Sequence, residues 1–139
     1  MDMNVKLSNG AIMPKKAYET DAGFDLYSLD TKIIQPHTSE TFDTGVHVEL
    51  PQNTVGLIKS KSGLNIRHGL VSEGVIDVGY TGSIRVNLYN HSNVPYTVMK
   101  GDKISQLVIV PIVQVNLKLV DSLENTERGN GGFGSTGKQ

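Results

Sequence analysis

Residues 84–89, with the sequence IRVNLY, alternate apolar and polar side chains at every step. Successive side chains of a β-strand point to opposite faces of a sheet, so this alternation predicts a strand with one face against a core. Residues 46–50, with the sequence VHVEL, repeat the same pattern. Because apolar residues at helical spacing are almost absent from the chain, these two stretches favour an all-β protein.

Three more segments rich in Val, Ile and Leu are expected to form strands, namely residues 55–58, 107–110 and 113–120. Clusters of turn-forming residues separate the expected strands, at residues 9–10, 50–53, 80–83, 90–95 and 100–102. One short helix is expected at about residues 62–67, with Ser62 as its N-cap. Many short strands at close spacing predict a barrel or a sandwich.

Composition narrows the class of protein. The chain has 139 residues, which is the usual size of one domain. Its 13 Lys and Arg against 14 Asp and Glu give a net charge of −1, which argues against bulk electrostatic binding of nucleic acid or an anionic membrane. The absence of cysteine excludes disulfides, thiol catalysis and Cys-ligated metals. Neither a signal-peptide pattern nor a long apolar run is found, and we expect a cytoplasmic domain.

The end of the chain is unusual, because five of the 15 glycines fall within the last eleven residues, GNGGFGSTGKQ. Residues 121–139 hold few apolar side chains, and a mobile terminus is the simplest interpretation. The alternative is a lid over a nucleotide. Glycines free backbone N–H groups to converge on phosphate oxygens, and Ser135 and Thr136 add hydroxyl donors. Arg128 adds a charge, and Phe133 offers a flat face for stacking on a base.

Three further segments suit the same ligand, and each also has an ordinary interpretation. Residues 21–28, DAGFDLYS, bring two acids together, which either solvate a loop or hold a metal-bound water or an arginine. Residues 59–64, KSKSGL, offer either anion-binding donors or an exposed strand end. Residues 74–82, GVIDVGYTG, place Asp77 after an apparently buried strand, where it either caps a turn or accepts a proton from an attacking water.

Other chemistries lack their sequence motifs. The chain has no GxxxxGK[ST] phosphate loop and no GxSxG serine-hydrolase motif. Its four histidines show neither HxxxH nor HExxH spacing, and we expect them at the surface or in packing contacts.

Five segments, in this order, resemble the five motifs of the homotrimeric dUTPases, a family with bacteriophage and prophage members. The resemblance runs from residue 17 to residue 137. The matching segments are AGFDLYS at residues 22–28, KSGL at 61–64, GVIDVGYTGSIRVNLYN at 74–90, GDKISQL at 101–107 and RGNGGFGSTG at 128–137. One such motif is modestly specific, whereas five in order with suitable spacing are very specific.

The resemblance implies a fold and an assembly. The expected fold is a distorted jelly-roll β-barrel with one short helix over residues 1–120, followed by a flexible, Gly-rich C-terminal arm over residues 121–139. The expected assembly is a homotrimer with each site between two subunits, closed by the arm of the third. A regulatory protein partner is left open, and no nucleic acid or membrane partner is expected.

The resemblance also implies an activity. The enzyme would hydrolyse dUTP to dUMP and pyrophosphate by in-line attack of a water on the α-phosphorus. The reaction would need Mg²⁺, which the triphosphate chelates without a direct bond to the protein. It would limit uracil incorporation into DNA and supply dUMP for dTMP synthesis, in the cytoplasm of a cell or of a phage host.

Site residues carry over by position in the motifs. Asp77 would be the catalytic base, and Tyr80 would pack under the deoxyribose and exclude a 2′-hydroxyl. Backbone near Gly74 and Arg85, in a β-hairpin formed by the third motif, would read uracil. The expected contacts to phosphate and the closing residues are Ser62, Gly63, Gln106, Arg128, Phe133, Gly134, Ser135 and Thr136, with Phe133 over the base. Asp25 would support the site through a water or a neighbouring arginine.

One position departs from the family pattern, because Lys61 stands where an arginine is usual. Lysine keeps the charge but loses the bidentate fork, so Lys61 is assigned only a supporting role. Two alternative functions remain open at this point. One is a dCTP deaminase of the same fold, which would not use this glycine-rich tail. The other is a nucleotide-gated regulatory binding protein. An inert scaffold module, by contrast, would need none of these motifs.

Overall fold

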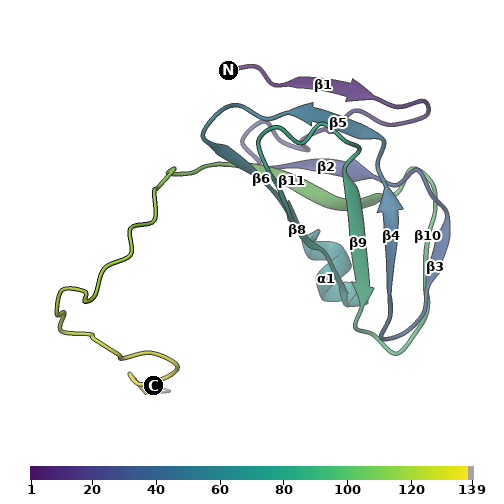
Figure 1. The fold of residues 1–139 in the computed structure, drawn as a ribbon. Coiled ribbons are helices and arrows are strands. Elements are labelled where there is room, and N and C mark those ends of the chain that lie inside the picture. Colours follow the sequence, from purple (N-terminus) through teal and green to yellow (C-terminus); the bar gives the residue numbers. More distant parts are fainter. Residues whose placement is uncertain (138–139) are drawn as a thin grey trace.

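The computed structural model describes residues 1–137, and these are mainly β-strands and loops (Figure 1). One short helix, α1 (Ser62–His68), lies between the strands of the described residues. The strands are β1 (Asn4–Leu7), β2 (Gly23–Tyr27), β3 (Lys32–Ile34), β4 (Ser39–Asp43), β5 (Val46–Glu49), β6 (Thr54–Lys59), β7 (Leu70–Val71), β8 (Glu73–Ile76), β9 (Arg85–Asn90), β10 (Tyr96–Val98) and β11 (Lys103–Pro111). The predicted β-fold with one short helix is therefore confirmed.

The strands pair antiparallel in four sheets. The largest has the order β2-β11-β6-β8, and a second has the order β4-β9-β7. Two strand pairs, β1 with β5 and β10 with β3, complete the body. The stretch at residues 84–89 forms most of β9, in which Val86 and Leu88 are buried while Arg85 and Asn87 are exposed. The alternation thus marks one buried face, as the sequence predicts.

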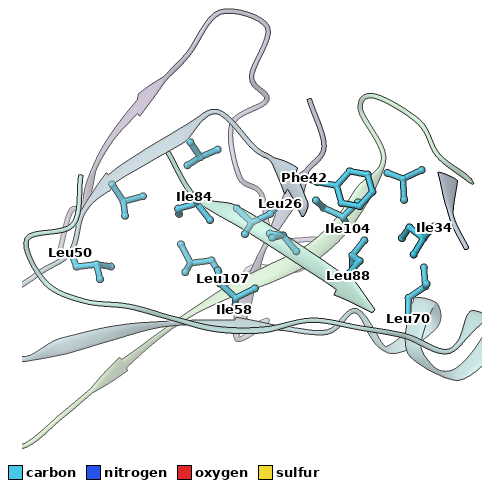
Figure 2. Close-up of a cluster of buried hydrophobic side chains, with 14 residues drawn as sticks. Leu26, Ile34, Phe42, Leu50, Ile58, Leu70, Ile84, Leu88, Ile104 and Leu107 are labelled. Atoms are coloured by element: carbon cyan, nitrogen blue, oxygen red, sulfur yellow. The ribbon is translucent and has the colours of Figure 1, made fainter. Parts of the chain in front are cut away.

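The core lies between the two larger sheets (Figure 2). Ile58 and Leu107 reach it from the sheet that contains β6 and β11, and Phe42 and Leu88 reach it from the sheet that contains β4 and β9. Phe42 and Leu88 are at most 1% exposed. Burying side chains of this size contributes about 1.5–3 kcal/mol each, so the two sheets are held face to face and their loops are fixed in place.

The expected strand at residues 113–120 is wrong for the single chain. β11 ends at Pro111, and the last hydrogen bond to the body is donated by the Ile112 N–H to the Asn53 carbonyl, at 2.9 Å. From residue 113 to residue 137 the chain extends away from the body without a partner strand (Figure 1). Alternating apolar residues favour a strand, but a strand also needs a neighbouring edge, and this segment has none within its own chain.

The expected hairpin in the third motif is also wrong. β8 pairs with β6, whereas β9 lies between β4 and β7, so the two strands belong to different sheets. The eight residues between them, 77–84, cross from one sheet to the other. β8 is not a buried strand either, since Glu73 and Val75 are exposed in the single chain.

Candidate active site

The first group of site residues surrounds Asp25, a carboxylate that is only 4% exposed. It accepts a hydrogen bond from Lys61 Nζ, and its second oxygen lies 3.4 Å from Lys103 Nζ. A buried carboxylate needs such partners to offset the loss of hydration. The expected arginine partner is therefore replaced by two lysines, of which sequence reasoning had missed Lys103.

Gln106 belongs to the same group because it lies in β11, which runs between β2 and β6. It stands opposite Asp25 on one side and opposite Lys59 on the other. Its side-chain Nε2 donates to the Ser60 carbonyl at 2.9 Å, which fixes the turn that leads into α1. Gly23 leaves the space that Gln106 fills, since a Cβ at Gly23 would lie 2.1 Å from Gln106 Oε1.

Ser62 and Gly63 open helix α1 next to this group and are exposed. The helix begins at Ser62 as expected, but its N-cap is Lys61 rather than Ser62, and no side chain caps it. A shallow hollow of about 240 Å³ lies here. Its lining consists of Lys61, Gly63, Leu64, Arg67, His68 and Lys103. Three of these side chains carry a positive charge at neutral pH, which suits an anionic ligand.

The second group lies in the loop at residues 77–84. Asp77 follows β8 directly and is exposed. The Tyr80 N–H donates to the Asp77 carbonyl at 3.1 Å, and Gly79 within this turn has a φ of 93°, which a residue with a side chain rarely adopts. The Tyr80 hydroxyl donates to the Ser83 carbonyl at 2.9 Å, and the side chain is 46% exposed. Asp77 and Tyr80 are therefore presented together by one tight turn.

The loop is attached to the connection between β4 and β5. Thr44 donates to the Ile84 carbonyl through its hydroxyl, at 2.7 Å, and the Ile84 N–H donates to the Val46 carbonyl at 2.8 Å. The Ser83 hydroxyl donates to Asp43. These contacts join residues about 40 positions apart in the sequence, and no local sequence motif predicts them.

The carboxylate of Asp43 is held in its charged form. Burial alone would raise the pKa of Asp43, but hydrogen bonds from the Ser83 hydroxyl and the Gly45 N–H oppose this effect. The nearby positive charge of Arg85 and the His47 ring add to these bonds, so the pKa of Asp43 falls below its ordinary value of 3.8. Asp43 thus links the loop to Arg85, which is exposed at the start of β9.

The two groups lie apart within one chain. In the β6–β8 pair, Gly56 faces Ile76 and Lys59 faces Glu73. Asp77 follows β8 and therefore lies at the end of the pair where β6 begins. Lys61 follows β6 and lies at the opposite end of the pair. At about 3.3 Å per residue, this places the two groups roughly 15 Å apart along β6. Gly74 lies between them, in the middle of β8.

The third group, in the C-terminal arm, contacts neither of the other two. Arg128 Nε donates to the Gly131 carbonyl at 2.6 Å, and further turns follow, closed by the N–H groups of Ser135 and Gly137. Phe133 is fully exposed and has a φ of 51°. Figure 1 shows this segment far from the body. The single chain therefore does not bring Arg128, Phe133, Gly134, Ser135 and Thr136 to the other predicted site residues.

Residues 1–137 meet neither of two simple requirements, those of a metal site and those of a membrane-spanning helix. No group of three or more His, Cys, Asp or Glu side chains in this range is placed to hold a metal ion. The helix found in the same range is too short and too polar to cross a membrane.

Comparisons with known proteins agree with this architecture. The family model described as dUTPase matches residues 9–137. The deoxyuridine 5′-triphosphate nucleotidohydrolase of Clostridium tetani is 45% identical over 135 residues, which cover 95% of this chain and 93% of that protein. The dUTPase of Staphylococcus bacteriophage 80alpha, solved with dUpNHpp, superposes with a TM-score of 0.92 at 35% identity and covers 98% of each chain.

A third relative is a variant of the dUTPase from phage phi11 of S. aureus, whose structure describes the coordination of a structural Mg(II) ion. It has a TM-score of 0.84 at 32% identity, and the match covers 90% of this chain and all of that one. The sequence motifs, the fold and the relatives agree over nearly the whole length. The chain belongs to the dUTPase family.

Proposed function

We propose that the protein hydrolyses dUTP to dUMP and pyrophosphate, with Asp77 as the catalytic base. The observation that carries the proposal is the presence of all five motifs within a family match over residues 9–137. The exposed Asp77 carboxylate can accept a proton from a water aimed at the α-phosphorus. The reaction would remove dUTP from the pool used for DNA synthesis and supply dUMP, in the cytoplasm of a cell or of a phage host.

Tyr80 is proposed to set the sugar specificity. Its hydroxyl is engaged by the Ser83 carbonyl, so the ring has a fixed position next to Asp77. A flat ring under a deoxyribose leaves no space for a 2′-hydroxyl, which would explain discrimination against UTP. Backbone near Gly74 and Arg85 is proposed to read the base.

Phosphate binding is assigned to the group around Asp25. Ser62 and Gly63 offer hydroxyl and backbone donors next to the positively charged hollow, and Gln106 supports this turn from β11. Lys61 is held by Asp25 and contributes charge. Mg²⁺ carried by the triphosphate would neutralise charge on the leaving pyrophosphate. Arg128, Phe133, Gly134, Ser135 and Thr136 would close over the nucleotide.

A homotrimer is proposed because one chain separates the parts of the site. Asp77 and Lys61 extend from opposite ends of the β6–β8 pair, so one chain does not place the proposed base beside the positively charged hollow. The arm reaches neither group. Val113, Val115, Leu117 and Leu119 form an exposed apolar row along the arm. Such a row is expected to be buried against another subunit.

The test is a pyrophosphate-release assay with Mg²⁺ over dUTP, dCTP, dTTP and UTP. We expect dUTP to be turned over far faster than the other three nucleotides, and we expect Asp77→Asn to bind dUTP while its kcat falls about a thousandfold. Ammonia release from dCTP would indicate a deaminase instead. Binding of dUTP by the unaltered protein without any turnover would favour the regulatory binding protein.

A further inference from the structure

His47 lies in β5, outside the five motifs, and reaches the loop that presents Asp77 and Tyr80. Its Nδ1 lies 2.8 Å from the Thr81 carbonyl oxygen, and its Nε2 lies 2.9 Å from the Ser8 hydroxyl. Because a carbonyl can only accept, Nδ1 must carry the proton and donate to Thr81. The ring therefore connects Thr81 to the segment that follows β1.

The ring also has a firm base on the body. Ser8 is anchored because its N–H donates to the Gly45 carbonyl at 2.8 Å. The neighbours of His47 in β5, Val46 and Val48, are at most 2% exposed. His47 is thus held on both sides by the core and at its tip by Ser8, which makes it a rigid support rather than a swinging surface group.

Thr81 is the point at which the loop bends under Tyr80. Gly82 follows it, and a Cβ at Gly82 would lie 2.5 Å from the Tyr80 hydroxyl oxygen and 2.7 Å from the carbon that bears it. The Tyr80 ring therefore rests on the backbone at Gly82. A change in the tilt of the Thr81 peptide moves the surface on which this ring rests.

We propose that His47 is a positioning residue that sets the orientation of Tyr80 and so sharpens the choice between deoxyribose and ribose. The inference rests on the proposed dUTP hydrolysis and names a further determinant of its specificity. Because Thr81 is exposed, water can replace the lost hydrogen bond, and folding should change little. The angle of the Thr81 peptide, however, depends on a donor at a fixed place.

Two amides distinguish a positioning role from a general one. In asparagine the amide nitrogen is bonded to Cγ, as Nδ1 is in histidine. In glutamine the amide nitrogen lies one bond further from Cγ and matches the position of histidine Nε2. His47→Asn should therefore restore the bond to Thr81, and His47→Gln should not. His47→Ala removes both bonds. His91→Ala is the matched control, since its ring packs on Tyr89 and makes no contact with the loop.

The experiment measures kcat/KM for dUTP and for UTP and takes their ratio. We expect His47→Ala and His47→Gln to lower the ratio about threefold to tenfold, the factor that one neutral hydrogen bond supplies. His47→Asn and the control should keep the ratio of the unaltered protein. A loss of folded protein would lower both rates equally and leave the ratio unchanged, so partial unfolding cannot imitate the expected result.

Two outcomes would overturn the inference. If the unaltered protein prefers dUTP and His47→Ala and His47→Gln keep that preference, His47 does not orient Tyr80 and the proposed function stands. If His47→Asn loses the preference as fully as His47→Ala, the bond to Thr81 is not the cause. A protein that hydrolyses neither nucleotide would instead overturn the proposed function, and this inference with it.

Discussion

A lysine, Lys61, holds the position between β6 and α1 where dUTPases usually carry an arginine. Its ammonium group is directed to Asp25, and Lys103 approaches the same carboxylate from β11. The ammonium groups of Lys61 and Lys103, which come from different elements, thus take the place of one planar guanidinium with several donors. This arrangement gives Lys61 a structural task that its charge alone would not reveal.

Removal of the Lys61 charge should therefore destabilise the fold. Lys61→Met leaves the buried Asp25 carboxylate with the more distant Lys103, and we expect a loss of about 1–3 kcal/mol in the free energy of unfolding. Lys61→Arg keeps a donor and should stay close to the original stability. Urea unfolding of both variants measures this, with Lys103→Met as a milder control. A Lys61→Met protein as stable as the original would contradict the assignment.

Asp43 should make stability depend on pH. Its pKa is lowered in the folded protein, because the hydrogen bonds to its charged form outweigh burial. A carboxyl group whose pKa is lowered by folding stabilises the folded protein at pH values above its ordinary pKa of 3.8. This stabilisation is lost as the pH falls through the lower pKa that the group has in the folded protein. We expect Asp43→Asn to be less stable than the original near neutral pH, with the difference shrinking below 3.8. Urea unfolding over a pH series tests this, and a constant difference would argue against it.

At the scale of the elements, alternation of side chains predicts strands well where a neighbouring strand exists. β9 has its expected place because Val86 and Leu88 both enter the core. The same kind of pattern fails at residues 113–120, since the missing partner edge cannot be known from local sequence. The prediction of a hairpin between β8 and β9 is wrong for a related reason. β8 pairs with β6 instead, and this pairing depends on the whole sheet rather than on the local sequence.

The candidate site shows the same contrast between features set by local sequence and features set by distant partners. Residues within a motif, such as Asp77 and Tyr80, come together in one turn and are found by their spacing. Lys103, Asp43 and His47 join the site from strands far along the chain. No short-range signal marks these three residues, apart from the place of Lys103 in the fourth motif. Sequence therefore identifies the groups that are proposed to meet the substrate better than the groups that hold them.

The arm provides a prediction for a whole element. Removal of residues 128–139 should leave the temperature of thermal unfolding unchanged, because residues 128–137 make no contact with the core. Turnover of dUTP should fall about a hundredfold or more, since the closing groups would no longer exclude water and orient the phosphates. Calorimetry and the pyrophosphate assay measure the two effects. A truncated protein with full activity would refute the lid.

At the scale of the whole molecule, the separation of Asp77 from Lys61 predicts a shared site. The native mass should be three times the 15.1 kDa of one chain. Chains with Asp77→Asn and chains lacking residues 128–139 should each be nearly inactive. When the two are folded together, mixed trimers can combine an intact Asp77 from one chain with an intact arm from another, and activity should return. Activity that stays at the sum of the separate proteins would contradict a shared site.

The position of β11 in its sheet has a consequence for biosynthesis. It is the last strand of the body to be made, yet it lies between β2 and β6, whose residues leave the ribosome much earlier. Until β11 emerges, β2 has no neighbour in that sheet, and β6 has only β8. Such long-range pairing delays folding until both partners are available. The nascent chain should therefore stay open through most of translation and close in one late step, with the arm acting as the tether that lets β11 clear the exit tunnel.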